Sequence, residues 1–134
     1  MNMQKTTGYI YFHIKTEEET HNLSFFDKYL SIKPTSFSQI GEKGNRPFCT
    51  TWEYSTGELT NHIYHIEVTK IIKKLSVHKD ELLKLKEENK DIQMGLQVVI
   101  YLNDDSPQLY FNKEVIDFLF YLGAEIDCDI YNNK

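Results

Sequence analysis

Apolar and polar positions alternate along three stretches of the chain with the period of a β-strand. These stretches are residues 8–15, 91–102 and 123–131. The middle one, DIQMGLQVVIYL, has the strongest pattern, so we expect it to lie centrally in a sheet. A fourth stretch, FCTTWEY at residues 48–54, is rich in β-branched and aromatic side chains and predicts a strand centred on Trp52.

Apolar residues recur at helical spacing in the segments between these strands. A first helix is predicted at about residues 22–31, before Pro34 ends it. A long amphipathic helix is predicted from Leu59, with a kink or short break near Ser76, where the apolar stripe loses its phase. A third helix is predicted in NKEVIDFLFYL, whose first residue, Asn112, is a good N-cap.

In chain order the predicted elements are a strand, a helix, a strand, a long helix, a strand, a helix and a strand. A short additional strand before the last helix is left open. This order predicts a single α+β domain over residues 1–134, with an ordered core at about residues 8–131. We expect a sandwich in which a mixed or antiparallel sheet of four to five strands is covered by helices on one face. The expected core residues are Ile10, Phe12, Ile14, Met94, Leu96, Val98, Ile126 and Ile130.

Composition narrows the class of protein. The chain has 134 residues, of which 40% are hydrophobic and 13% aromatic, as in a folded globular protein. No apolar run resembles a signal peptide or reaches the ~18 residues of a membrane span, so a cytoplasmic protein without a membrane partner is expected. The net charge of −5 opposes binding to nucleic acids or anionic membranes. A basic protein partner is therefore favoured.

Several short segments together resemble a known bacterial family. They are the opening strand YIYFHI, SIKPT around Pro34 and Thr35, the glycines Gly41 and Gly44, the strand with Trp52, and LGAEIDCDIY. In their order and spacing they resemble the domain of unknown function numbered 4279, along most of the chain. The resemblance implies an α+β fold and no established activity. The segment 44–48 is sparser in basic residues than is typical of that family and leaves Arg46 nearly alone.

The last predicted strand has an acidic face made of Glu125, Asp127 and Asp129, with Tyr131 following them. Alternate residues of a strand project about 6.6–7 Å apart, so Asp127 and Asp129 can reach one metal ion. The alternative is that these carboxylates form the hydrated side of an edge strand, where charge discourages pairing with another molecule. In that case they are available to a basic partner.

Two other polar groups have similar alternatives. His62 and His65 are three residues apart on the long helix, a spacing that suits metal ligation, but they equally fit the border of its buried face. The segment GEKGNR at residues 41–46 can form a small anion-binding nest or a solvated loop.

The aromatic residues Trp52, Tyr54, Tyr9 and Tyr11 can line a recognition surface, although core packing is the default for Trp52. Neither cysteine, Cys49 or Cys128, lies in a metal-binding or nucleophile motif. Exposure of Trp52 would favour recognition, and its burial would favour the core.

No nucleophile motif or phosphate-binding loop occurs in the sequence, so we expect a non-enzymatic module that binds a basic protein, of the inhibitor or immunity type. The alternative is a metal-dependent enzyme or small-ligand site at Asp127 and Asp129, and a homodimer formed through an edge strand or through aromatic residues is a third possibility. No cofactor is expected. The candidate binding residues are Arg46, Trp52, Glu125, Asp127, Asp129 and Tyr131.

Overall fold

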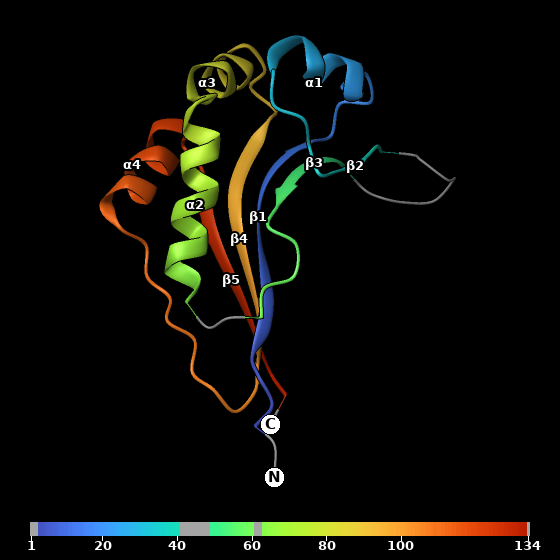
Figure 1. Ribbon diagram of the computed structural model, residues 1–134. Coiled ribbons are helices and arrows are strands. Elements are labelled where there is room, and N and C mark those ends of the chain that lie inside the picture. The colour runs from blue at the N-terminus through green and yellow to red at the C-terminus, as the bar shows by residue number, and fades with distance from the viewer. Residues whose placement is uncertain (1–2, 41–48, 61–62, 134) are drawn as a thin grey trace.

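The computed structural model describes residues 3–40, 49–60 and 63–133, which form five strands and four helices. The strands are β1 (Thr7–Thr16), β2 (Ser36–Ser38), β3 (Thr50–Ser55), β4 (Gln93–Leu102) and β5 (Glu125–Asn132). The helices are α1 (Leu23–Tyr29), α2 (Tyr64–Ser76), α3 (Lys79–Glu88) and α4 (Lys113–Leu122). All five strands belong to one sheet, and the helices gather along one side of it (Figure 1). The predicted α+β class is confirmed.

The sheet is mixed, with the strand order β2-β3-β1-β4-β5. Its neighbouring strands are antiparallel except β4 and β5, which are parallel and are joined through α4. The segment 91–102 was expected in the sheet interior, and β4 does lie between β1 and β5. The fifth strand is β2, which falls inside a segment without strand periodicity.

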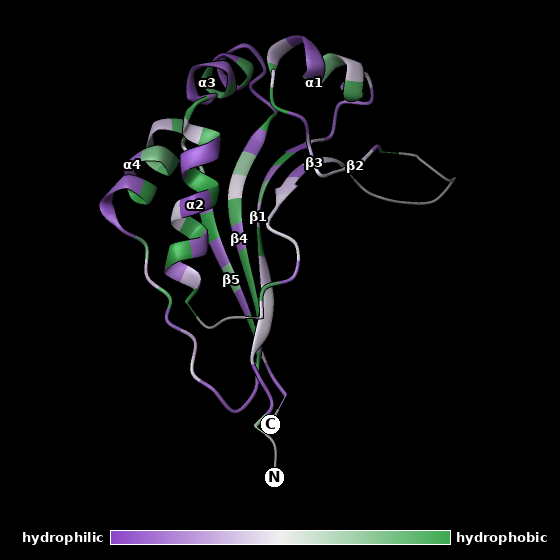
Figure 2. Cartoon of the chain, viewed as in Figure 1, coloured by the Kyte–Doolittle hydropathy of each residue, from purple (hydrophilic) through white to green (hydrophobic). Residues whose placement is uncertain are grey.

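The core lies between the helices and one face of the sheet. Along β1 every second side chain is buried, and its partners on β3 and β4 continue the same buried face. Figure 2 shows hydrophobic and hydrophilic residues interleaved on α2 and α4, as expected of helices that bury one side. Fully buried side chains in this layer include Phe12, Ile14, Trp52, Tyr64, Ile72 and Leu96.

Two expected core residues are not buried. Ile126 is 39% exposed and Ile130 is 58% exposed, although they face the same side of the sheet as the core. The reason is that β5 is an edge strand. The buried side chains of α4, such as Phe118 and Leu119, pack toward β4 and the helices α2 and α3.

Side-chain caps mark the starts of two helices, α1 and α4. The side chain of Asn112 caps α4, as expected, that of Asn22 caps α1, and Gly123 ends α4 with a positive φ of 62°. The expected break near Ser76 is present, since α2 ends there and α3 begins at Lys79.

The expected helix start at Leu59 was wrong, because α2 begins at Tyr64. Leu59 instead exchanges two backbone hydrogen bonds with Gly8, at 3.1 and 2.7 Å, which buries its side chain without a helix. None of the described helices has the length and apolar character that crossing a membrane requires.

Candidate functional site on the open face of the sheet

The face of the sheet that points away from the helices carries most of the polar candidates from the sequence. Strand alternation and register bring side chains from β1, β3, β4 and β5 together on this surface. We call it the open face. Its main members are Tyr9, Tyr11, His13, Lys15, Glu53, Gln97, Tyr101, Glu125, Asp127, Asp129 and Tyr131.

Tyrosine rings form two stacked pairs on the open face. The ring centroids of Tyr9 and Tyr11 are 5.9 Å apart with an interplanar angle of 17°, and those of Tyr101 and Tyr131 are 5.4 Å apart at 18°. Burial raises the pKa of Tyr11 to about 12, and the nearby carboxylates of Glu53, Asp129 and Asp127 act in the same direction. The phenol of Tyr11 therefore remains protonated near neutral pH and can act as a hydrogen-bond donor.

The carboxylates of β5 lie on the open face, close to Gln97 of β4. The Nε2 atom of Gln97 donates a hydrogen bond of 3.0 Å to Oδ2 of Asp129, and Gln97 is itself buried, which holds this carboxylate in place. In the part of the chain that the structure describes, no ion pair involves Glu125, Asp127 or Asp129. The negative charge of this strand is therefore not compensated within the described residues.

His13 lies under this surface and contributes no positive charge at neutral pH. Its ring packs against Gly95, where an added Cβ atom would lie only 2.7 Å from Nε2 of His13. Burial lowers the pKa of His13 to about 4, with a further lowering by Lys15 and a smaller opposing influence of Asp127. Its Nδ1 atom is buried and has no hydrogen-bond partner among the described residues.

The remaining sequence candidates lie elsewhere. Trp52 is fully buried between the sheet and the helices, so it packs in the core and cannot touch a ligand on the open face. Arg46 and the rest of the segment 41–46 lie outside the described residues, as does His62. The ring of His65 stacks on Tyr110, with centroids 4.3 Å apart.

A metal centre was the alternative for the acidic strand. Among the described residues, no group of three or more His, Cys, Asp or Glu side chains is arranged to hold a metal ion. Asp127 and Asp129 do share the open face, but one oxygen of Asp129 already accepts a hydrogen bond from Gln97.

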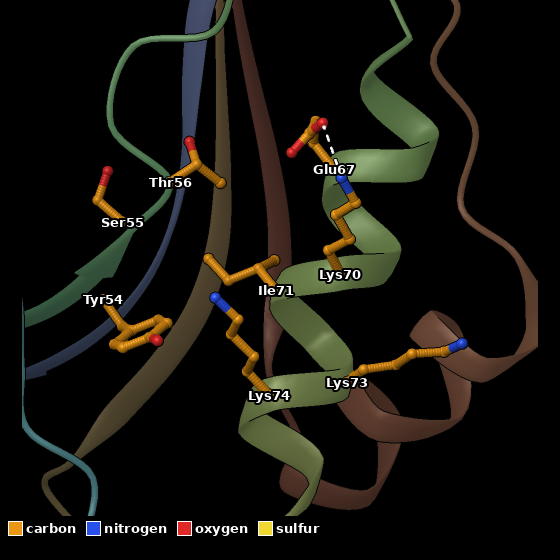
Figure 3. A pocket seen from close by; sticks show the side chains of 8 residues that line it. All are labelled: Tyr54, Ser55, Thr56, Glu67, Lys70, Ile71, Lys73 and Lys74. Atoms are coloured by element: carbon orange, nitrogen blue, oxygen red, sulfur yellow. Dashed lines mark ion pairs between the residues drawn. The ribbon is translucent and has the colours of Figure 1, made fainter.

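A groove of about 430 Å³ separates the end of β3 from α2, on the helix side of the sheet (Figure 3). Its lining residues are Tyr54, Ser55, Thr56, Glu67, Lys70, Ile71, Lys73 and Lys74. Lys70 pairs with Glu67 at 3.6 Å, whereas Lys74 extends toward Tyr54 and Lys73 points away from it (Figure 3). Sequence reasoning missed this groove because its lysines fit the solvent-exposed side of an amphipathic helix.

A second polar cluster that the sequence did not reveal lies at the end of β1. The hydroxyl of Thr16 donates to the carboxylate of Asp91, lies 3.0 Å from Nδ1 of His21, and accepts the backbone N–H of Glu18. The ring of His21 stacks on Phe25 with centroids 3.9 Å apart. The buried positions of Thr16 and His21 give this cluster a structural role, which is to tie the end of β1 to the turn before β4.

Comparison with known proteins gives one match. Residues 5–133 match the family model described as Domain of unknown function (DUF4279). No curated protein and no solved structure matches the chain significantly.

Proposed function

The chain belongs to the DUF4279 family, whose description names no activity, and we propose that it is a non-enzymatic module that binds a basic protein on its open face. An inhibitor or immunity protein of a cationic effector is the type that fits this proposal. The observation that carries it is the acidic row of Glu125, Asp127 and Asp129, which forms no ion pair with any described residue, beside two stacked tyrosine pairs.

This surface suits the side chains of Lys and Arg. Carboxylates accept charge-assisted hydrogen bonds from both, and tyrosine rings attract cations through their negative faces. The bond from Gln97 holds Asp129 in place before binding, which reduces the entropy lost on association. His13 is neutral near pH 7 and Lys15 is the basic side chain among the members of the open face, so the local field remains negative.

The charge of the whole chain acts in the same direction. A net charge of −5 accelerates the encounter with a cationic partner, and salt screens this attraction over a Debye length of about 8 Å at physiological ionic strength. Cys49 and Cys128 are both free thiols, which agrees with a module that works in the reducing cytoplasm. The metal-dependent alternative at Asp127 and Asp129 stays a prediction.

The test compares the native chain with the double variant Asp127→Asn, Asp129→Asn as baits in extracts of the host cell. Asn keeps the size of Asp and removes its charge. We expect the native chain to capture a basic protein that is released by added salt and that the double variant does not hold. The matched control is Glu18→Gln with Glu19→Gln, which removes two exposed charges from the loop between β1 and α1.

The control variant should capture the same basic protein as the native chain, because its charges lie outside the open face. Capture that is indifferent to salt, or equal for the native chain and the Asp127 and Asp129 variant, would contradict the proposed function.

A further inference from the structure

Among the described strands, none pairs with the outer edge of β5. Strand β5 is the last strand in the order β2-β3-β1-β4-β5, and its partner β4 runs parallel to it. Just beyond the strand, the N–H of Asn133 donates to the C=O of Leu102 at 2.9 Å. In a parallel pair, successive residues direct their backbone groups alternately to the two sides. This bond therefore fixes which residues face β4, and those of even number direct their N–H and C=O groups outward.

The outward backbone groups belong to Ile126, Cys128 and Ile130. The side chains of the same three residues lie on the helix side of the sheet, because they pair in register with the core residues Leu96, Val98 and Ile100. Yet Ile126 is 39% exposed, Ile130 is 58% exposed, and Cys128 is exposed as well. The free edge is thus flanked by an uncovered apolar row on one face and by carboxylates on the other.

The opposite edge of the sheet offers much less. Strand β2 contains only three residues, Ser36–Ser38, whereas β5 contains eight. Edge strands of folded proteins are commonly shortened or charged so that they do not pair with other molecules. The edge strand β2 is shortened, whereas β5 keeps its full length and carries charge on one face.

We propose that the free edge of β5 accepts an extended strand of the partner, in which Lys or Arg residues alternate with apolar residues. The basic side chains of the added strand lie beside Glu125, Asp127 and Asp129, and its apolar side chains cover Ile126 and Ile130. Main-chain hydrogen bonds supply affinity and the alternating side chains supply specificity, as in other cases of strand addition. This inference rests on the proposed function and specifies the chemistry of its partner.

A second copy of this chain fits the edge poorly. Antiparallel pairing of two β5 strands about Cys128 would set Asp127 of one copy opposite Asp129 of the other. Like charges directly opposite each other in a sheet are destabilising, and each copy also carries a net charge of −5. The same carboxylates attract a basic strand, so charge selects a foreign strand over self-association.

The test uses a synthetic peptide of about eight residues, a common strand length, in which Lys and Val alternate. Two derivatives carry N-methyl groups on every Val amide or on every Lys amide, which keeps the side chains and blocks one backbone edge. In an antiparallel pair the Val amides face β5, and in a parallel pair the Lys amides do. We expect one derivative, and only one, to bind at least about tenfold more weakly than the parent peptide in calorimetry.

The matching change in the protein is Cys128→Pro. Proline removes the outward N–H and leaves the ladder to β4 intact, and it is tolerated where a strand amide faces solvent. We expect Cys128→Pro to lose binding of the parent peptide by about tenfold or more, whereas Cys128→Ser keeps it. A thermal scan verifies that Cys128→Pro is folded. If this variant is unfolded, the methylated peptides still test the same backbone contact on the native chain.

The outcomes separate this inference from the proposed function. If both methylated peptides bind as the parent does, or both lose binding, strand addition is overturned. Suppose that the parent and both methylated peptides bind the native chain equally, and that none of them binds the Asp127→Asn, Asp129→Asn variant. The open face then still receives a basic partner, but without strand addition. If no peptide binds the native chain, both proposals fail. Light scattering tests for a second copy at the same edge. If the native chain has a mass of twice 15.9 kDa and Cys128→Pro has the mass of a single chain, a second copy occupies the edge. That result would overturn the assignment to a basic strand.

Discussion

Acid should destabilise this protein through His13, beginning only slightly below neutral pH. The ring packs against Gly95 beneath the open face, and burial lowers its pKa from 6.5 to about 4. The unfolded chain therefore takes up the proton first as the pH falls. Stability contributed by the neutral ring is complete above about pH 6.5 and is lost progressively as the pH falls toward 4.

The size of this loss follows from the two pKa values. With 6.5 in the unfolded chain and about 4 in the fold, linkage gives a loss of about 2 kcal/mol between about pH 7 and about pH 5. His13 is only partly buried, so solvent screening reduces the expected loss to ~1 kcal/mol. Lys15, Asp127 and Glu53 also face the ring or its neighbours, and burial raises the pKa of Glu53, which acts in the opposite direction.

The assay is urea unfolding of the native chain and of His13→Gln at several pH values between 7 and 5. Glutamine stays neutral throughout, so the difference between the two proteins isolates the histidine and cancels the carboxylates that both share. We expect the native chain to lose ~1 kcal/mol relative to His13→Gln across this interval. Parallel stability curves for the two proteins would refute the assignment of a neutral, partly buried imidazole.

Substitutions at three further positions, Gly95, Gly123 and Trp52, probe the fold by urea unfolding. Gly95→Ala should lower the free energy of unfolding by about 1–3 kcal/mol, because the new Cβ meets the ring of His13. If this contact is the cause, combining Gly95→Ala with His13→Ala should restore part of that free energy. Gly123→Ala should cost about 1–2 kcal/mol because its φ is 62°, and Gly123→Asn should cost less, whereas equal costs would contradict a conformational origin. Trp52→Ala should cost about 3–5 kcal/mol from a fully buried site, and a cost below ~1 kcal/mol would show that this site is not packed in the core.

Much of the fold was predictable because its signals are local. Periodicity located β1, β4 and β5, and the capping residue Asn112 marked the start of α4. Periodicity does not say what covers a face, however. The alternation of β5 correctly placed Ile126 on the same side as the core, but only the strand order shows that this strand is an edge and that the side chain remains exposed.

Leu59 illustrates a different limit. The spacing of Leu59 to the next apolar residues, Ile63 and Ile66, fits a helix. The burial of its side chain is also what the apolar side of a helix would show. The burial in fact results from pairing with Gly8, a contact between distant parts of the chain that a local pattern cannot express.

The candidate site was predictable only in part, because it is assembled across strands. The acidic face of β5 was visible in the sequence, and so was the row of tyrosines on β1. Their neighbours were not, since Gln97 reaches Asp129 only through the register of β4 and β5. Gly95 was a usable signal, because a glycine inside a strand often marks close approach of another group, in this case the ring of His13.

The carboxylates of β5 can either protect the edge of the sheet against pairing or bind a partner. The geometry of the strand makes these two roles compatible. Charge protects an edge only against strands of the same sign. On β5 the carboxylates lie on one face, while the backbone groups of Ile126, Cys128 and Ile130 remain directed outward. A copy of the same chain meets Asp opposite Asp, whereas a basic strand meets complementary charge at the same positions. Replacing Asp127 and Asp129 with Lys should therefore abolish binding of the Lys-Val peptide and create binding of its Glu-Val counterpart. If the Glu-Val peptide does not bind this variant, the backbone edge itself contributes little to binding.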